Sequence, residues 1–317
     1  MNGGPPASGA GATVPAEAVT TGSAAVVSFG DRLEQVFAAH GQLCVGIDPH
    51  PWLLRDWDLP DTAAGAESFG RAVVAASAGR VGLVKPQVAF FERFGSAGFA
   101  ALERVLVDAR AASLLVIGDA KRGDLGTSVE AYAQAWLSPG SPLEVDALTL
   151  AAYMGVGSLD SPLALAAANG KGVFLLAATS NPEAAHIQQA IVADGPQAGS
   201  TVARAVLEEV GQRNARAGAA SARVATGLGS IGVVLGATLD LAAFGIDVNR
   251  APAEFRTPVL APGFGHQGGN IMDLISIYGG YAGGVIVSES RSVLSAGPHR
   301  IEEAIERRVA EVGAVRG

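Results

Sequence analysis

Residues 114–124 read Leu-Leu-Val-Ile-Gly-Asp-Ala-Lys-Arg-Gly-Asp, an apolar run that ends in closely spaced charges. The run has the length and aliphatic character of a buried strand. Because strand side chains alternate between two faces, Asp119 and Lys121 should point the same way. Gly123 permits a tight turn that would bring Asp124 back over the strand end. This pattern favours a functional cluster of paired charges, although a salt-bridged rim with Asp124 as a turn residue is the structural alternative.

The rest of the chain repeats this pattern of a short apolar run followed by an amphipathic stretch. The expected strands are 42–48, 81–87, 114–121, 147–152, 172–180, 231–235, 258–261 and 283–288. The expected helices lie at about 66–79, 97–112, 127–136, 157–168, 198–216, 238–244, 270–277 and 299–312. Such alternation predicts parallel βαβ units, in either a closed (β/α)8 barrel or an open doubly wound sheet. Polar residues end many of the expected strands: Asp48, Lys85, Lys121, Ser180 and Ser288. A barrel gathers such ends around one mouth, so this α/β chain is expected to be a TIM barrel.

Composition narrows the class of protein. The 317 residues are 49% hydrophobic and 16% charged, with a net charge of −8, which argues against broad nucleic-acid binding. The single cysteine, Cys44, excludes an internal disulfide and a multi-cysteine metal site, and it fits a reducing, cytoplasmic location. No apolar run reaches the roughly 18 residues of a membrane span, and no signal-peptide pattern is expected at the start. Residues 1–25 lack an apolar period, so we expect a flexible low-complexity tail there and a single barrel domain over 26–317.

Five short motifs, taken in order, resemble those of orotidine 5′-phosphate decarboxylases. They are Val45-Gly46-Ile47-Asp48-Pro49, Lys85-Pro86-Gln87, the Asp-x-Lys-x-x-Asp stretch at 119–124, the Leu-Ala-Pro-Gly-Phe-Gly-His-Gln-Gly-Gly stretch at 260–269, and Ser290-Arg291-Ser292. The Lys-Pro-Gln element and the longer insertions are similar to the subclass found in mycobacteria and related bacteria. The resemblance covers most of the chain after the tail. It implies a TIM-barrel carboxy-lyase that converts orotidine 5′-monophosphate (OMP) to UMP in de novo pyrimidine biosynthesis, without a metal or organic cofactor.

The resemblance also implies roles for individual residues. It assigns catalysis to an alternating array of Lys85, Asp119, Lys121 and Asp124, with Lys121 as the proton donor to C6 of the pyrimidine. It further implies a homodimer in which Asp124 and Ser128 are shared across the interface. Substrate contacts follow from the same motifs: Asp48 with the ribose, Ser180 with the pyrimidine amide edge, Gln267 and Arg291 with the 5′-phosphate, and Pro262 within the 260–269 motif.

The implied chemistry explains the need for these residue types. Loss of CO2 from C6 leaves a carbanion in the ring plane, with no adjacent π system to delocalise it. A cationic Lys121 would stabilise that charge and then protonate it, while Asp119 would face the departing carboxylate. A unit charge pair at 4 Å contributes about 4 kcal/mol at an effective dielectric of 20. Large enzymatic accelerations require about 8–23 kcal/mol, so remote phosphate and ribose contacts must supply much of the remainder.

Several of these residues also have structural interpretations. Asp48 resembles a loop cap, and both Thr127 and Ser180 open capping-box patterns. Arg291 could be a surface arginine beside Glu289. Glu289 is itself a departure, since many relatives have Gly-Arg-Ser after the last strand. Tyr153 and Met154, which follow the fourth strand, are expected to pack.

Two segments match the pattern Gly-x-Gly-x-x-Gly. Residues 227–232 lead into an apolar run rather than a helix, which disfavours a dinucleotide site. Residues 263–268 follow the seventh strand, where barrels bind phosphate, and their backbone amides could cradle an anion. His266 lies in this segment, whereas the other histidines show no metal-ligand spacing.

Two other functions compete with the decarboxylase. A related phosphosugar lyase or aldolase could use the same Asp-x-Lys-x-x-Asp framework with Mg²⁺ and an enediolate. A non-catalytic nucleotide-binding or assembly protein is the second alternative. The Lys-Pro-Gln element and the phosphate loop favour the decarboxylase, and the intact charged array argues against a protein that only binds.

Overall fold

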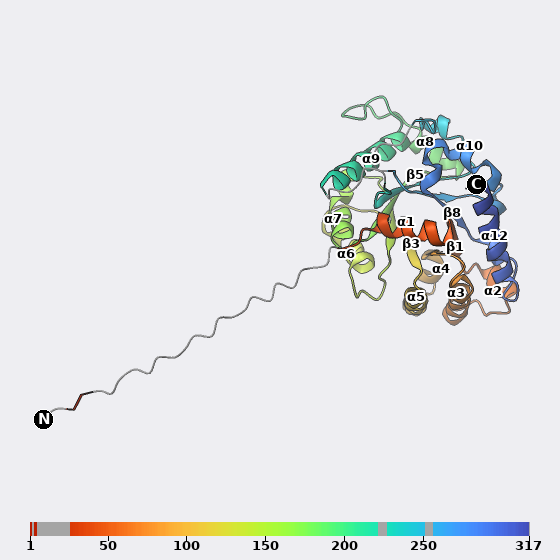
Figure 1. The fold of residues 1–317 in the computed structure, drawn as a ribbon, viewed down its shortest axis with the longest axis horizontal. Helices are drawn as coiled ribbons and strands as arrows, with labels where there is room; N and C mark the ends of the chain where they lie inside the picture. Colours follow the sequence, from red (N-terminus) through yellow and green to blue (C-terminus); the bar gives the residue numbers. More distant parts are fainter. Residues whose placement is uncertain (2, 5–25, 221–226, 251–255, 317) are drawn as a thin grey trace.

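The computed structural model describes residues 1, 3–4, 26–220, 227–250 and 256–316. The tail expected over residues 1–25 therefore lies almost wholly outside the described residues. In the described part of the chain, eight parallel strands close into a barrel (Figure 1). The strands are β1 (Leu43–Ile47), β2 (Leu83–Pro86), β3 (Leu115–Arg122), β4 (Ala147–Leu150), β5 (Gly172–Ala178), β6 (Ile231–Leu235), β7 (Val259–Pro262) and β8 (Val285–Glu289). Leu43 of β1 pairs with Val287 of β8, so the closed barrel is confirmed and the open sheet is excluded.

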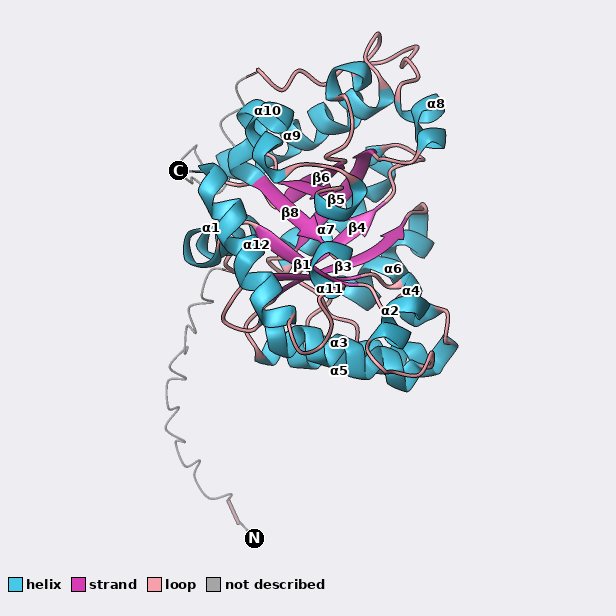
Figure 2. Cartoon of the chain, turned by 90° about the vertical axis from the view of Figure 1, so that its right-hand side faces the viewer, coloured by secondary structure: helices cyan, strands magenta, loops and turns pink. Residues whose placement is uncertain are grey.

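Helices surround the strands (Figure 2). The α-helices are α1 (Phe29–His40), α2 (Pro51–Asp56), α3 (Ala63–Ser77), α4 (Ala89–Glu92), α5 (Gly95–Ala111), α6 (Gly126–Leu137), α7 (Asp160–Ala168), α8 (Ala185–Gln188), α9 (Val202–Ala220), α10 (Leu274–Tyr278), α11 (Arg291–Leu294) and α12 (Ile301–Arg316). The 3-10 helices are η1 (Val156–Leu159), η2 (Pro182–Ala184), η3 (Leu241–Phe244), η4 (Gly265–Gln267), η5 (Ile271–Asp273) and η6 (Gly279–Gly284). Each expected strand and most expected helices have a counterpart here.

One expected helix is wrong. The stretch 238–244 forms only the short turn η3, whose N-cap Asp240 accepts a hydrogen bond from the backbone N–H of Ala242. Gly245 then takes a left-handed conformation with φ 71° and stops the turn. Residues 238–244 therefore contain one short 3-10 turn in place of the expected helix.

The strands are buried on both faces because two apolar clusters cover them. One cluster fills the space between the strands and the outer helices. The other lies inside the barrel and includes Phe29 and Leu33 of α1, together with Phe174 of β5. The rings of Phe29 and Phe174 meet edge to face with centroids 6.0 Å apart. Helix α1, which was not expected from the sequence, therefore helps to close the amino-terminal end of the barrel.

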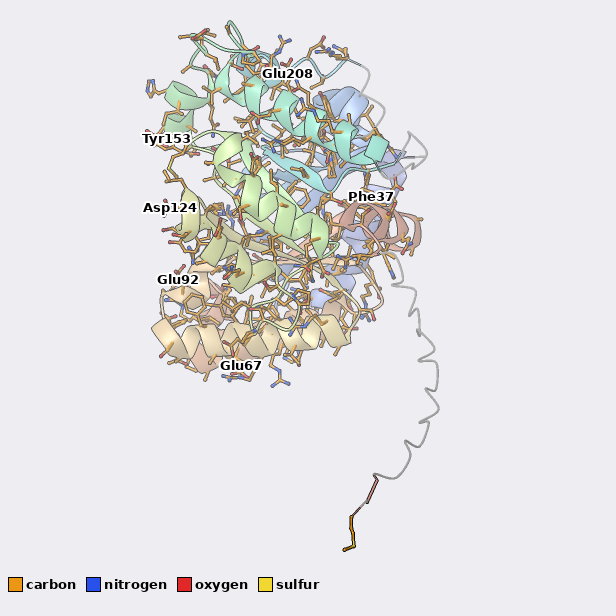
Figure 3. The ribbon with its side chains drawn as sticks, turned by 90° about the vertical axis from the view of Figure 1, so that its left-hand side faces the viewer. Phe37, Glu67, Glu92, Asp124, Tyr153 and Glu208 are labelled. Atoms are coloured by element: carbon orange, nitrogen blue, oxygen red, sulfur yellow. The ribbon has the colours of Figure 1, made fainter. Side chains whose placement is uncertain are left out.

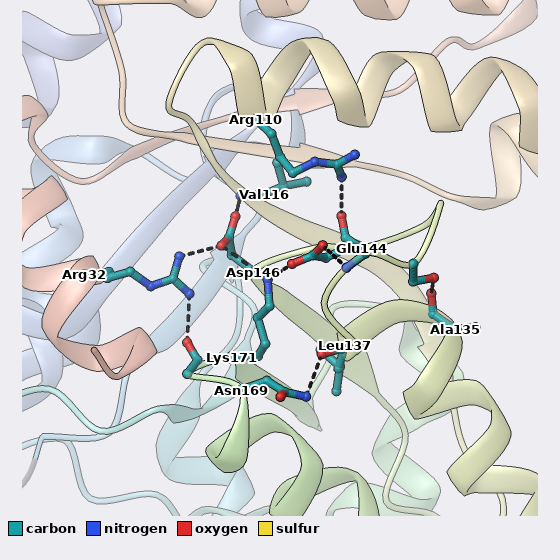
Figure 4. Close-up of polar contacts among 12 residues, drawn as sticks. Arg32, Arg110, Val116, Ala135, Leu137, Glu144, Asp146, Asn169 and Lys171 are labelled. Atoms are coloured by element: carbon teal, nitrogen blue, oxygen red, sulfur yellow. Dashed lines mark hydrogen bonds and ion pairs between the residues drawn. The ribbon is translucent and has the colours of Figure 1, made fainter. Parts of the chain in front are cut away.

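Ion pairs and hydrogen bonds join α1 to the segments before β4 and β5, at the amino-terminal end of the barrel (Figure 4). Arg32 of α1 donates to Asp146 at 2.5 Å and to the carbonyl of Gly170 at 2.8 Å. Lys171 pairs with Glu144 at 2.7 Å. Helix α1 and its ion pairs cover the amino-terminal end of the barrel. A site is therefore expected at the other end, where the strands have their carboxyl ends. In the described residues, no helix is both long and apolar enough to span a membrane.

Candidate active site

A cavity of about 420 Å³ opens at the carboxyl ends of the strands. Its charged and polar lining comes from several strand ends and the loops that follow them: Asp48, His50, Lys85, Gln87, Asp119, Lys121, Thr179, Ser180, Asn181, His266, Gln267, Ser288, Ser290, Arg291 and Ser292. Phe90, Leu176, Val234, Leu260 and Phe264 contribute apolar surface. A cavity of this size that combines apolar walls with converging polar groups is typical of a small-molecule site.

Asp119 is the centre of a hydrogen-bonded charge cluster on the cavity wall. Its Oδ2 accepts from Lys85 Nζ and from Gln87 Nε2, each at 3.0 Å. Its Oδ1 accepts from Lys121 Nζ at 2.6 Å and from Thr149 Oγ1 at 3.0 Å. Four donors on two oxygens hold the carboxylate in one orientation.

The cluster keeps its charges despite burial. Burial by itself would lower the pKa of Lys85, but the Asp119 and Asp48 carboxylates outweigh it and raise that pKa above its ordinary value. Burial likewise would raise the pKa of Asp119, but the ammonium groups of Lys85 and Lys121 hold it well below its usual range. Both groups are therefore ionised at neutral pH.

Lys121 reaches the cluster through an unusual backbone path. Its φ is 47°, in the left-handed region that side chains other than glycine rarely adopt. The backbone N–H of Lys121 donates to Thr149 Oγ1 at 2.9 Å, and the pairing of β3 with β4 shifts register between Gly118 and Arg122. Thr149 thus fixes both the Lys121 backbone and the Asp119 carboxylate. Such local strain is a feature of positions that serve a site.

A glycine-rich loop and a short helix line another side of the cavity. Gly265 begins η4 with φ 69°, and Gln267 and His266 are exposed on the same turn. Arg291 begins α11 and lines the cavity, half-buried. These groups can offer an amide and a guanidinium to an anion.

Two buried oxygens in the cavity are ready for a ligand. Among the described residues, neither Asp48 Oδ1 nor Ser290 Oγ has a hydrogen-bond partner. Buried polar atoms in proteins are normally paired, so these two oxygens are available to a polar ligand.

Eight of the ten site residues expected from the sequence line this cavity: Asp48, Lys85, Asp119, Lys121, Ser180, Pro262, Gln267 and Arg291. The other two, Asp124 and Ser128, lie outside it. Asp124 accepts a hydrogen bond from the backbone of Leu125 at 2.8 Å, and Ser128 is exposed. Figure 3 places Asp124 and Tyr153 along one outer edge of the molecule.

The structure contradicts the capping roles considered for Thr127 and Ser180 and the packing role expected of Tyr153 and Met154. Helix α6 begins at Gly126, so Thr127 lies inside the helix and is not its cap. Ser180 does not cap the turn η2, whose N-cap is Asn181 and which has no side-chain cap bond. Tyr153 and Met154 do not pack in the core, since their side chains are 80% and 42% exposed.

Sequence reasoning missed other members of the site. Gln87 follows Lys85 at the spacing of one strand face, so the alternation that links Asp119 to Lys121 could have identified it. His50 lines the cavity, with its ring 4.2 Å from that of Phe90, although the absence of metal-ligand spacing had set it aside. Burial lowers the pKa of His50 below its ordinary value. Thr149 carried no sequence signal, because its role depends on the register shift of β3.

Comparison with known proteins agrees with this geometry. The model of the "Orotidine 5′-phosphate decarboxylase / HUMPS family" matches residues 41–304. Orotidine 5′-phosphate decarboxylase of Salinispora tropica is 49% identical over 271 residues, which cover 86% of this chain and 91% of the relative. The enzyme of the same name from Streptomyces coelicolor is 45% identical over 272 residues, covering 85% and 91%. A crystal structure from Streptomyces avermitilis, provisionally assigned the same name, is similar with a TM-score of 0.81 and 43% identity, covering 92% of this chain and 96% of the other.

Proposed function

The chain belongs to the orotidine 5′-phosphate decarboxylase family and is a carboxy-lyase, and we propose that it converts OMP to UMP and CO2 at the cavity of the barrel mouth. The observation that carries the proposal is the hydrogen-bonded cluster of Lys85, Asp119 and Lys121 on the wall of that cavity. Its neighbours in the same cavity include groups suited to a ribose, a pyrimidine and a phosphate.

The first step of the proposed reaction breaks the bond between C6 and its carboxylate. The electron pair stays on C6 and CO2 leaves. Lys121 Nζ stabilises this carbanion by its charge and then transfers a proton to C6, becoming a neutral amine. The side chain of Lys121 is 45% exposed, so it can turn toward a ligand in the cavity.

Asp119 has a different part in the proposal. The three donors other than Lys121 prevent it from rotating away when the substrate carboxylate arrives. The two like charges then repel each other until CO2 departs. Because a single charge pair contributes about 4 kcal/mol at an effective dielectric of 20, this contact cannot supply the whole acceleration. Binding contacts away from C6 must contribute to the transition state.

The binding contacts proposed for OMP follow the polar groups of the cavity. Asp48 Oδ1, which has no partner in the described residues, suits a ribose hydroxyl. Ser180 and Pro262 lie where they can contact the pyrimidine, and Gln267 and Arg291 offer donors to the 5′-phosphate.

We also propose a homodimer with shared sites. Asp124 and Ser128 lie outside the cavity of their own chain. The segments that follow the paired strands β3 and β4 also carry exposed apolar side chains: Leu125, Tyr132, Tyr153 and Met154. Clustered apolar exposure of this kind indicates an association surface. In a symmetric dimer, such a surface would bring Asp124 and Ser128 to the neighbouring cavity.

Loss of OMP absorbance, followed with purified protein in the presence and absence of EDTA, tests the proposed function. We expect turnover that EDTA does not affect. Turnover that EDTA abolishes would point to the metal-dependent lyase chemistry of related barrels. UMP binding without any turnover of OMP by a folded dimer would indicate a protein that only binds nucleotide.

A further inference from the structure

A buried carboxylate lies beneath the two segments proposed to bind phosphate. Glu289 ends β8, and its side chain is 0% exposed. It accepts a hydrogen bond from Ser292 Oγ in α11. A Cβ added at Gly265 would lie 3.2 Å from Glu289 Oε2, so the carboxylate also packs against the first residue of η4. Glu289 thus touches both the segment that carries Arg291 and the segment that carries Gln267.

Glu289 is not itself placed to bind the ligand. Ser288 lines the cavity, and alternation along β8 directs the next side chain to the other face, toward α12. There Arg308 donates to Oε2 through Nε at 3.0 Å and to Oε1 through Nη2. Arg308 is itself largely buried, with 13% of its side chain exposed, and it also pairs with Glu311.

The ion pair with Arg308 offsets the negative charge that Glu289 places behind the phosphate-binding segments. A phosphate is negative, and a buried carboxylate close behind its loops would oppose binding if it were unpaired. The bidentate ion pair with Arg308 both offsets the charge of the carboxylate and fixes its orientation. A carboxylate fixed in this way holds Ser292 and, through the same helical turn, its neighbour Arg291.

We propose that Glu289 and Arg308 are positioning residues for phosphate recognition. Glu289 orders the start of α11 against η4, and Arg308 cancels the charge that this ordering introduces. The inference rests on the proposed function, because it takes the ligand of these segments to be the 5′-phosphate of OMP and UMP.

Two substitutions separate this role from a merely structural one, because only Arg308→Met should lower the ratio of UMP affinity to uridine affinity. In Arg308→Met, the Glu289 carboxylate loses the bond that fixes its orientation against Ser292 and offsets its charge, so UMP should bind about tenfold more weakly while uridine affinity stays nearly constant. In Glu289→Gln, the amide keeps the shape and can still accept from Ser292, while Arg308 retains Glu311. The ratio should then stay at the wild-type value or rise.

Arg307→Met is the matched control. Arg307 lies on the same helix, but its side chain is 60% exposed and pairs with Glu311 at 3.9 Å. Both affinities should match the wild type in this variant. Dissociation constants come from calorimetry with UMP and from competition with uridine.

Several outcomes would overturn the inference: unchanged UMP affinity in Arg308→Met, an equal loss of UMP and uridine, or a fall of the ratio in Glu289→Gln. If Arg308→Met does not fold, Glu289→Gln decides the matter: a fall of the ratio overturns the inference, and a ratio at or above the wild-type value supports it. Wild-type protein that prefers UMP to uridine but does not turn over OMP would refute the decarboxylation and leave the pair's role standing. Wild-type protein without that preference would overturn both.

Discussion

At the scale of single residues, Asp119 organises the charge cluster of the site. Lys85 and Gln87 occupy one of its oxygens, and Lys121 and Thr149 occupy the other. Burial of an isolated carboxylate would be strongly unfavourable, so these donors are what allow it to remain charged. The same donors make Asp119 a fixed negative charge, against which a second carboxylate would be placed under repulsion.

Replacement of Lys121 by alanine tests the proposed proton donor. We expect Lys121→Ala to lower the turnover number by at least about a hundredfold, because general acid catalysis alone contributes about 10²–10⁴. The fold should persist, since the Lys121 side chain is 45% exposed and its backbone bond to Thr149 does not depend on the side chain. Single-turnover kinetics and circular dichroism measure the two effects. Near-normal turnover would refute the assignment.

The ionisation of Asp119 predicts a pH dependence of stability. Its pKa is lower in the folded state than in the unfolded chain, so the stabilisation linked to it is complete above the unfolded value and declines as the pH falls toward the folded value. Below a pH of about 3.9, the stability advantage of the wild type over Asp119→Asn should decrease by about 1.4 kcal/mol per pH unit.

Urea unfolding of both proteins between pH 7 and pH 3 measures this difference. Asp108→Asn is a suitable control, because Asp108 pairs with Arg71 on the exposed surface and should show a smaller slope. A difference between wild type and Asp119→Asn that stays constant down to pH 3 would contradict the lowered pKa.

At the scale of secondary structure, the strands were the most predictable elements. Buried parallel strands consist of short, nearly continuous apolar runs, and each of the eight runs is a strand. The alternation rule also placed Asp119 and Lys121 on one side, although the backbone takes a left-handed step at Lys121 to achieve it. That step, and with it the role of Thr149, depends on cross-strand register, which a single sequence does not reveal.

Helices and caps were less predictable, because they depend on local competition. Helix α1 has an N-cap at Ser28 and an apolar stripe, but its partner surface is the barrel interior, which exists only after closure. The pattern at Thr127 is typical of a cap, yet α6 begins at Gly126, where φ is 58°. The burial of Glu289 likewise depends on a contact between elements, because its partner Arg308 belongs to α12, 19 residues further along the chain.

Helix α11 carries a prediction of its own. Arg291 begins this element and should supply charge-assisted bonds to phosphate, each contributing about 1.5–3 kcal/mol. Arg291→Ala should therefore weaken UMP binding by about tenfold or more, with little change in uridine binding. Arg93→Ala is the matched control, because Arg93 lies outside the cavity lining and pairs with Asp61. Unchanged affinity for UMP in Arg291→Ala would undo the phosphate assignment.

At the scale of the whole molecule, we propose that residues 26–317 act as a single catalytic domain. Val27 already lies against Gly170 at the amino-terminal end of the barrel, opposite the cavity. Deletion of residues 1–25 should therefore leave both turnover and the thermal midpoint close to those of the full chain. A large loss of specific activity in a folded truncation would contradict this proposal.

The proposed dimer makes the sharpest prediction, because each site would combine Lys121 of one subunit with Asp124 of the other. Lys121→Ala and Asp124→Asn should each be inactive alone, since every site then lacks one member of the array. Refolded together in equal amounts, half the dimers would be mixed, and each mixed dimer would contain one intact site. The mixture should recover about a quarter of wild-type turnover.

If Asp124 instead served its own chain, no combination of these two variants would create an intact site, and mixing would recover nothing. The Asp108→Asn variant mixed with Lys121→Ala should give about half of wild-type turnover whether or not the subunits exchange, so this mixture controls for losses during refolding.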